Sequence, residues 1–223
     1  NTFYLIKDSS RVGFRDPEEY KSYGYNFTQA VPASTYDLAL PMTSIGRAME
    51  GTLVLDSADG RTVYMIGANS TKRGFVSSKV FTALGYSFAN LPRINLSDYP
   101  TGSPIGSSVL AHPDGSLVKE GITIWWIRNG QKVGFESMTV FNTYGFSLSR
   151  VVKANAADMN LPEGPVVKLR DGTLVMDQST YFIISRAKKL AFTSEHQMTS
   201  LGYRIANVIF TSLMGYEYGG LVR

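Results

Sequence analysis

The chain has 223 residues, with 22 Lys and Arg against 18 Asp and Glu, which gives a formal net charge of +4 at pH 7. Cys is absent, which excludes disulfides, thiol nucleophiles and Cys-bound metals. The basic residues are scattered, so we expect no nucleic-acid partner. No apolar run approaches the roughly 20 residues that cross a bilayer, so we expect no membrane span.

Four segments of the chain repeat one pattern at intervals of about 60 residues. In chain order, each repeat predicts a first strand, a polar turn and a second strand that ends in phenylalanine. A helical turn follows, opened by an N-cap residue and ended by a Gly-aromatic dipeptide. The aromatic residues of the first strand are Tyr4, Tyr64, Trp125 and Phe182, and the N-cap residues are Asp16, Ser77, Ser137 and Ser194.

A strand of the type Gly-x-Leu-Val precedes the hairpins of the second, third and fourth repeats, at residues 51–54, 115–118 and 172–175. A further copy, Gly219, Gly220, Leu221 and Val222, has no hairpin after it, whereas the first hairpin has no such strand before it. The two ends are therefore complementary. We predict that the C-terminal strand completes the first sheet and closes a ring.

The predicted fold is mainly β with short helices: a four-bladed β-propeller of four repeats of about 55–60 residues, closed by the C-terminal strand. One propeller domain would occupy residues 1–223, with blades at about 219–223 plus 1–49, 50–109, 110–167 and 168–218. An open solenoid would need polar caps at its ends. Four separate small domains without disulfides or metals would each be marginally stable.

The motif Lys72-Arg73-Gly74-Phe75-x-Ser77-x-x-x-Phe81-x-x-Leu84-Gly85-Tyr86 resembles repeats of bacterial secreted and cell-surface proteins. The order strand–strand–strand–helix–strand is similar to the hemopexin-like four-bladed propeller. That family commonly joins its first and last blades by a disulfide, so closure of this Cys-free chain would depend on strand pairing. The resemblance covers nearly the whole chain. It implies an extracellular or cell-surface location and a non-catalytic binding or structural role, and it carries no established site residues.

A basic residue recurs three positions before the end of each second strand: Arg11, Lys72, Lys132 and Lys189. In a ring these four cations would share one circle and could face an acidic glycan or a protein partner. The alternative is that they are solvated edge residues that guard against aggregation. Trp125 and Trp126 form a second candidate, because exposed indole rings stack on sugars, although both faces of these strands are apolar and burial between blades is the favoured explanation for their aromatic residues.

The sequence indicates no catalytic residue. His112 and His196 have no partner at metal-ligand spacing, and no nucleophile elbow occurs. We therefore expect a monomeric, non-catalytic module that contacts glycan or protein, with no cofactor except an ion of unknown identity that the central channel could hold. The alternatives are a polysaccharide hydrolase or lyase built on a propeller, and a scaffold domain without a small ligand.

Overall fold

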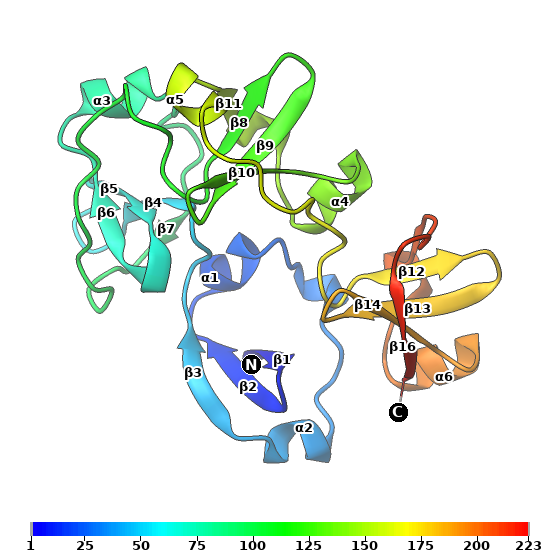
Figure 1. Ribbon diagram of the computed structural model, residues 1–223. Helices are drawn as coiled ribbons and strands as arrows, with labels where there is room; N and C mark the ends of the chain where they lie inside the picture. The colour runs from blue at the N-terminus through cyan, green and yellow to red at the C-terminus, as the bar shows by residue number, and fades with distance from the viewer. Residues whose placement is uncertain (1, 223) are drawn as a thin grey trace.

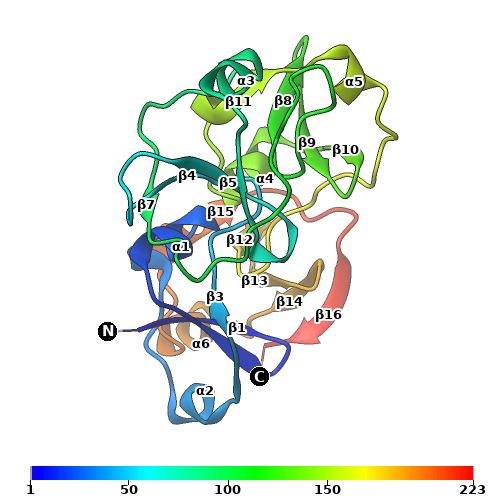
Figure 2. The same ribbon diagram turned by 90° about the vertical axis from the view of Figure 1, so that its left-hand side faces the viewer.

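The computed structural model describes residues 2–222 and contains one β-sheet for each repeat (Figure 1). We call the repeats the first unit (residues 3–46), the second unit (53–105), the third unit (117–167) and the fourth unit (174–221). In both views the second and third units lie at the top, and the first and fourth lie below them (Figure 1, Figure 2). The prediction of a mainly β protein with short helices and four repeats is confirmed.

The strands of the first two units are β1 (Phe3–Lys7), β2 (Ser10–Phe14), β3 (Met42–Gly46), β4 (Leu53–Asp56), β5 (Val63–Ile66), β6 (Lys72–Gly74) and β7 (Arg93–Ile94). Those of the third unit are β8 (Leu117–Glu120), β9 (Thr123–Arg128), β10 (Gln131–Gly134) and β11 (Val151–Lys153). Those of the fourth are β12 (Leu174–Asp177), β13 (Thr180–Ser185), β14 (Lys188–Ala191), β15 (Ile209–Phe210) and β16 (Glu217–Leu221).

The helices are short and connect the strands. The α-helices are α1 (Pro17–Ser22), α2 (Thr35–Ala39), α3 (Ser78–Ala83), α4 (Met138–Thr143), α5 (Ala156–Met159) and α6 (Glu195–Ser200). The 3₁₀ turns are η1 (Phe27–Gln29), η2 (Ala68–Ser70), η3 (Leu148–Arg150) and η4 (Ile205–Asn207). The predicted N-caps are confirmed, because the side chains of Asp16, Ser77, Ser137 and Ser194 each accept a hydrogen bond from a backbone N–H in the first turn of α1, α3, α4 or α6.

The fourth sheet shows the most complete topology, with strand order β15-β12-β13-β14-β16. Its three central strands are antiparallel, whereas β15 runs parallel to β12 and β16 runs parallel to β14. The outer strands are parallel because the chain crosses back over a helix before it pairs again. The second and third units repeat this plan, with the last strand reduced to isolated parallel bridges near Ile105 and Val167.

The predicted ring closure is wrong. Gly219, Gly220 and Leu221 belong to β16, which pairs with β14 of its own unit, and the N–H of Val222 donates to the carbonyl of Ala191 over 2.9 Å. The pairing of β16 is set by its position at the end of the fourth unit, and not by its four-residue sequence similarity to the Gly-x-Leu-Val strands. β3 pairs in the same parallel way with β2, so β16 is the counterpart of β3 and not of the Gly-x-Leu-Val strands.

The strand pairing also does not produce a propeller. Propeller blades are antiparallel sheets, whereas the outer strands of these sheets are parallel to their neighbours. No strand pairing joins one sheet to another within residues 2–222. The units meet instead through loops, helix ends and apolar side chains, and the largest buried cluster combines residues of the third unit, such as Trp126 and Phe141, with residues of the fourth, such as Val175 and Leu213.

Two of these contacts between units are alike. At the end of α3, Gly85 lies against Val152 of the third unit, where an added Cβ would be 3.1 Å from the valine Cβ. At the end of α6, Gly202 lies in the same way against Val31 of the first unit, at 3.3 Å. The fourth unit therefore contacts the first as the second contacts the third. None of the helices between residues 2 and 222 has the length and apolar character to cross a membrane.

Candidate binding cleft between the first and second units

The four repeated basic residues lie on four different sheets and make the same pair of contacts, each inside its own unit. Each cation lies over the aromatic ring of the neighbouring strand, at 5.1 to 5.6 Å from the ring centroid. Each also donates to a backbone carbonyl later in its own unit: Arg11 to Leu40, Lys72 to Leu96, Lys132 to Met159 and Lys189 to Leu213. The structure does not bring the four together, and ligand binding by them stays a prediction.

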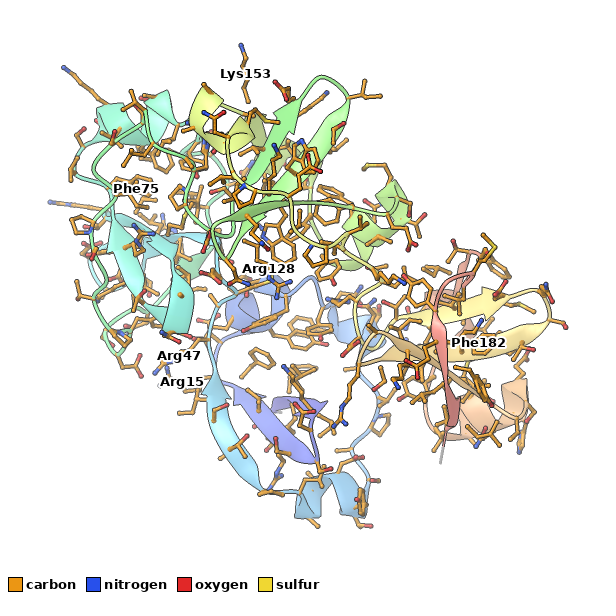
Figure 3. The ribbon with its side chains drawn as sticks, in the orientation of Figure 1. Arg15, Arg47, Phe75, Arg128, Lys153 and Phe182 are labelled. Atoms are coloured by element: carbon orange, nitrogen blue, oxygen red, sulfur yellow. The ribbon has the colours of Figure 1, made fainter. Side chains whose placement is uncertain are left out.

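The two tryptophans have different surroundings. Trp125 is half-buried, and its ring faces the Lys132 ammonium group on the neighbouring strand. Trp126 is buried among the aromatic residues of the third unit, and the guanidinium of Arg128 lies 4.7 Å from its ring centroid (Figure 3). Stacking of either indole on a glycan stays a prediction.

One histidine has a buried acidic partner. The Nδ1 atom of His112 lies 2.7 Å from Asp158, whose other carboxylate oxygen accepts from the His112 backbone N–H. The Nε2 atom lies 3.0 Å from the carbonyl oxygen of Leu84, so both ring nitrogens face oxygen atoms. Burial raises the pKa of Asp158, but hydrogen bonds from His112 and from the backbone of Asn155 outweigh it, so this pKa lies below its ordinary value. The pair joins the second unit to the third.

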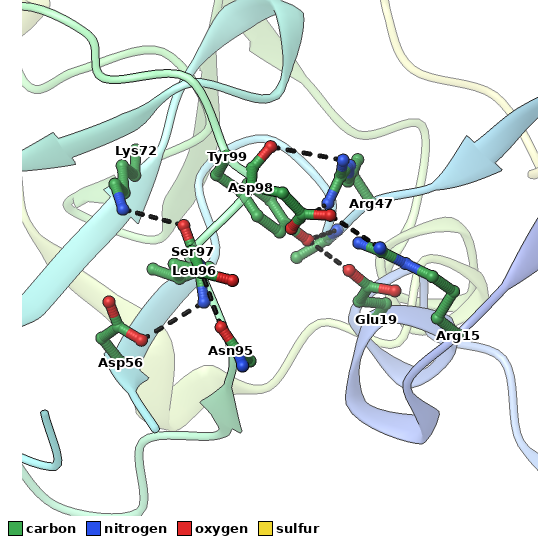
Figure 4. Close-up of polar contacts among 11 residues, drawn as sticks. Arg15, Glu19, Arg47, Asp56, Lys72, Asn95, Leu96, Ser97, Asp98 and Tyr99 are labelled. Carbon is green, nitrogen blue, oxygen red and sulfur yellow. Dashed lines mark hydrogen bonds and ion pairs between the residues drawn. The ribbon is translucent and has the colours of Figure 1, made fainter. Parts of the chain in front are cut away.

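The candidate site is a cleft of about 270 Å³ between α1 of the first unit and the loop after β7 of the second unit. Figure 4 shows its polar groups. Arg15 and Glu19 come from the first unit, and Asn95, Ser97 and Asp98 come from the second.

Hydrogen bonds hold the loop that forms the second wall. The N–H of Leu96 donates to the Asp56 carboxylate at the end of β4, over 3.2 Å, and its carbonyl accepts from Lys72 over 2.8 Å. The side chain of Asn95 accepts from the N–H of Ser97, which turns the chain before Asp98. The repeated lysine of the second unit therefore positions the cleft without lining it.

Asp98 pairs with two arginines at the rim of the cleft. It lies 2.6 Å from the Arg15 guanidinium and 2.8 Å from that of Arg47. Hydrogen bonds from Arg15 and then from Arg47 lower the pKa of the Asp98 carboxyl well below its usual range. The hydrogen bond between Arg15 and Asp98 also raises the pKa of Arg15. The rim of the cleft thus carries two positive charges, from Arg15 of the first unit and Arg47 of the linker, and one negative charge, from Asp98 of the second unit.

A buried carboxylate lies at the base of the cleft. Glu19 is 1% exposed; its Oε1 atom accepts from the Tyr99 hydroxyl over 2.6 Å, and its Oε2 atom has no hydrogen-bond partner within residues 2–222. The same hydroxyl accepts from the Ala48 N–H over 2.9 Å. Burial, followed by the hydrogen bond to Glu19, raises the pKa of Tyr99. An unpaired buried carboxylate oxygen is unfavourable, so Oε2 is an atom of this region that lacks a donor.

The interface between the third and fourth units repeats the tyrosine contact without the cleft. The hydroxyl of Tyr216 accepts from the Leu169 N–H over 2.8 Å and donates to Glu136 over 3.1 Å. Lys168 lies over the Tyr216 ring at 4.8 Å, as Arg47 lies over Tyr99 at 4.6 Å. Burial is the main cause that raises the pKa of Tyr216 to about 12. The first and second units therefore pair as the third and fourth do.

Sequence reasoning missed Glu19, because the acidic pair Glu18-Glu19 is explained by its place at the start of a helix. Alignment of the repeats contains the signal that identifies it. The equivalent positions hold Val80 and Val140, which face the interiors of their units, and Gln197 in the fourth unit. A carboxylate at a position that is apolar in the second and third units indicates a specific polar partner.

A second hollow, of about 370 Å³, lies beside β11 and the turn after β8. Its polar side chains are exposed, and they include Lys119, Glu120 and Lys153 (Figure 3). It contains no buried charged group, so it resembles solvated surface more than a built site. In the part of the chain that the structure describes, no group of three or more His, Asp or Glu residues could hold a metal ion.

No protein-family model matches the sequence, and no curated protein matches it. Among solved structures, the chain is similar to one in the structure of an intact ESX-5 inner membrane complex, with 14% identity and a TM-score of 0.22 over 79% of this chain and 55% of that one. It is also similar to one in the periplasmic assembly from the ESX-5 inner membrane complex, with 12% identity and a TM-score of 0.22 over 79% and 64%. The match thus spans less than two thirds of each of those chains, and likeness at this level carries no argument about function.

Proposed function

We propose that this protein is a non-catalytic binding module of a bacterial cell surface or of secreted material, and that the cleft between its first and second units contacts a glycan. The unpartnered Oε2 atom of buried Glu19 is the observation that carries the proposal. Because Glu19 is buried, its side chain would turn towards the cleft for a sugar hydroxyl to donate to this oxygen, while Arg15 and Asn95 at the same cleft offer donors to other hydroxyls. The resemblance of the repeated motif to repeats of bacterial secreted and cell-surface proteins supports the location.

The cleft suits binding better than hydrolysis. Glycoside hydrolysis uses two carboxyl groups, one of which gives a proton to the leaving group. Asp98 is paired with Arg15 and Arg47, which keeps it ionised, and Asp16 caps α1. Glu19 is left as the single carboxylate of the cleft with a free oxygen. A polysaccharide hydrolase or lyase therefore ranks below a binding module.

The test is a glycan array followed by calorimetric titration of the saccharides that bind. Glu19→Gln keeps an acceptor for Tyr99 and replaces the second carboxyl oxygen by an amide nitrogen. Glu136→Gln is the matched control, because Glu136 accepts from Tyr216 in the same way but lies outside the cleft. We expect saccharide binding to be lost in Glu19→Gln and kept in Glu136→Gln.

Other results would contradict the proposal. Binding that survives Glu19→Gln would place the glycan elsewhere. Turnover of a polysaccharide that Glu19→Gln abolishes would show a hydrolase or lyase. Absence of any saccharide binding would support a scaffold domain without a small ligand.

A further inference from the structure

The first sheet has an open strand position that is filled in the other three. In the second, third and fourth units, the first hairpin strand is covered on its outer side by β4, β8 or β12. In the first sheet the order is β1-β2-β3, so within residues 2–222 nothing pairs with the outer edge of β1. Unpaired strand edges of this kind accept an added strand.

The exposure of Ile6 shows that the first sheet lacks a covering strand. Ile66, Ile127 and Ile184 occupy equivalent positions and are 0%, 1% and 1% exposed, whereas Ile6 at the end of β1 is 46% exposed. The three buried residues exchange backbone hydrogen bonds with the start of the covering strand. The N–H of Gly51 donates to Ile66 over 2.7 Å, and the N–H of Ile66 donates to Thr52 over 2.9 Å.

A glycine of the fourth unit faces the same open position. Gly51 and Gly115 open the covering strands of the second and third units and lie against each other, so that a Cβ on Gly115 would be 2.2 Å from the Gly51 Cα. Gly172 opens the covering strand of the fourth unit, and an added Cβ there would meet nothing within 4 Å. The fourth unit contacts the first as the second contacts the third, so the missing neighbour of Gly172 is the glycine of a covering strand on β1.

Two further side chains lack the partners that their counterparts have. Tyr86 bonds to Ser116 over 2.8 Å, and Asp158 bonds to His112; both partners lie in the segment that precedes β8. The counterpart of Tyr86 is Tyr203, whose hydroxyl makes no hydrogen bond in the described chain. The counterpart of Asp158 is Asp37, whose carboxylate accepts from Ser34 and from no histidine.

We propose that the first sheet binds an extended polypeptide segment from outside residues 2–222, with the pattern His-x-x-Gly-Ser-Leu-Val, which pairs antiparallel with β1. In the register of the other sheets, its Val lies opposite Tyr4 and its Leu opposite Leu5. Its Gly contacts Gly172, its Ser bonds Tyr203 and its His bonds Asp37. The segment lies outside residues 2–222, because the segments of this type between residues 51 and 175 already lie in the chain's own sheets. This interaction is independent of the glycan cleft.

The probe is a synthetic peptide of residues 111–120, blocked at both ends and titrated into the full chain by calorimetry. Hydrogen exchange of the β1 amides gives the second readout, because only strand pairing protects them. A peptide with Leu and Val replaced by Ser is the control ligand. We expect saturable binding of the first peptide, protection of Leu5 and Ile6, and no binding of the control.

Ile6→Lys places a charge where the added strand would bury an apolar side chain, so we expect affinity to fall about tenfold or more. Ile122→Lys is the matched control, because Ile122 is 96% exposed and lies in the turn after β8. Tyr203→Phe removes one oxygen and leaves the fold intact. Its effect should disappear with a peptide in which Ser is replaced by Ala, as the two changes remove one hydrogen bond.

Three outcomes would overturn the proposal. The peptide fails to bind, it binds without protection of β1, or the chain forms a dimer through β1 that Ile6→Lys dissociates, which would make a second copy the occupant. Loss of saccharide binding in Glu19→Gln with peptide binding unchanged would separate this interaction from the proposed function.

Discussion

Gly24 and Gly145 lie against each other with no room for a side chain, where the ends of α1 and α4 meet. A Cβ on Gly145 would lie 2.1 Å from the Gly24 Cα, and a Cβ on Gly24 would lie 2.3 Å from the Tyr144 carbonyl oxygen. Both residues are left-handed, with φ of +74° and +67°. They are equivalent positions of the first and third units. This backbone contact sets how closely the two units approach.

Gly145→Ala should destabilise the protein strongly. The left-handed conformation costs about 1 kcal/mol for Ala, and relief of the contact with Gly24 adds about 2 kcal/mol. Gly60→Ala is the control, because Gly60 has a φ of +65° and nothing within 4 Å of an added Cβ. Urea unfolding of both variants tests this. Equal losses of stability in Gly145→Ala and Gly60→Ala would show that the first and third units can move apart to make room for the added methyl group at no cost in free energy.

The two tyrosine contacts between units should be of similar strength. Tyr99→Phe and Tyr216→Phe each remove a hydroxyl that accepts from a backbone N–H and donates to a glutamate. Each change should lower the free energy of unfolding by about 2 kcal/mol, because buried polar groups lose their partner. Tyr36→Phe, at an exposed position, should have no measurable effect. A neutral result for either buried tyrosine in calorimetry would contradict the shared role.

The His112–Asp158 pair should stabilise the contact between the second and third units. His112→Ala leaves a buried carboxylate, so we expect a loss of about 3–5 kcal/mol. His196→Ala is the control, because that side chain is exposed. Unfolding of the two variants by urea, followed by tryptophan fluorescence, compares them. A small effect of His112→Ala would mean that water replaces the imidazole.

The pH dependence of stability should reflect Asp98. Its pKa in the folded protein is depressed by Arg15 and Arg47, so its contribution is complete above the unfolded value of about 4 and is lost as pH falls towards the folded value. Carboxyl chemical shifts followed by NMR from pH 5 downwards should show Asp98 titrating below ordinary aspartates. Arg47→Gln should move this titration upwards. An ordinary Asp98 titration in the unaltered protein would contradict the two ion pairs.

Removal of residues 217–223 should destabilise the fourth sheet and not the first. β16 pairs with β14, so the amides of β14 should lose hydrogen-exchange protection while those of β2 keep theirs. Loss of protection in the first sheet instead would support closure of a ring.

The repeats, the hairpins and the helix caps could be predicted from the sequence because each is a local pattern. Asp16 followed by Pro17 and two acids indicates a helix start in any context. The pairing of β16 could not be predicted in this way. Leu221 and Val222 resemble a covering strand over four residues, whereas the partner of a strand depends on where the preceding crossover leaves the chain.

The candidate site was harder to predict, because its groups come from two units. The four repeated cations are conspicuous in the sequence, yet each is used inside its own sheet. Glu19 and Tyr99 are far apart in the chain, and only the packing of α1 on the second unit brings them together. The signal that singles out Glu19 is its departure from the valine that the second and third units have at this position.

The tyrosine contact occurs at alternate junctions, and this has a consequence for how such a chain could grow. The first unit joins the second, and the third joins the fourth, through a tyrosine contact, whereas in the described chain the junctions between these pairs lack it. If a single unit were inserted, two surfaces of the same kind would meet at one junction, and that junction would have either two tyrosines or none. Insertion of two consecutive units would preserve every junction. We therefore expect gene duplication in proteins of this kind to add units two at a time, so that the number of units stays even.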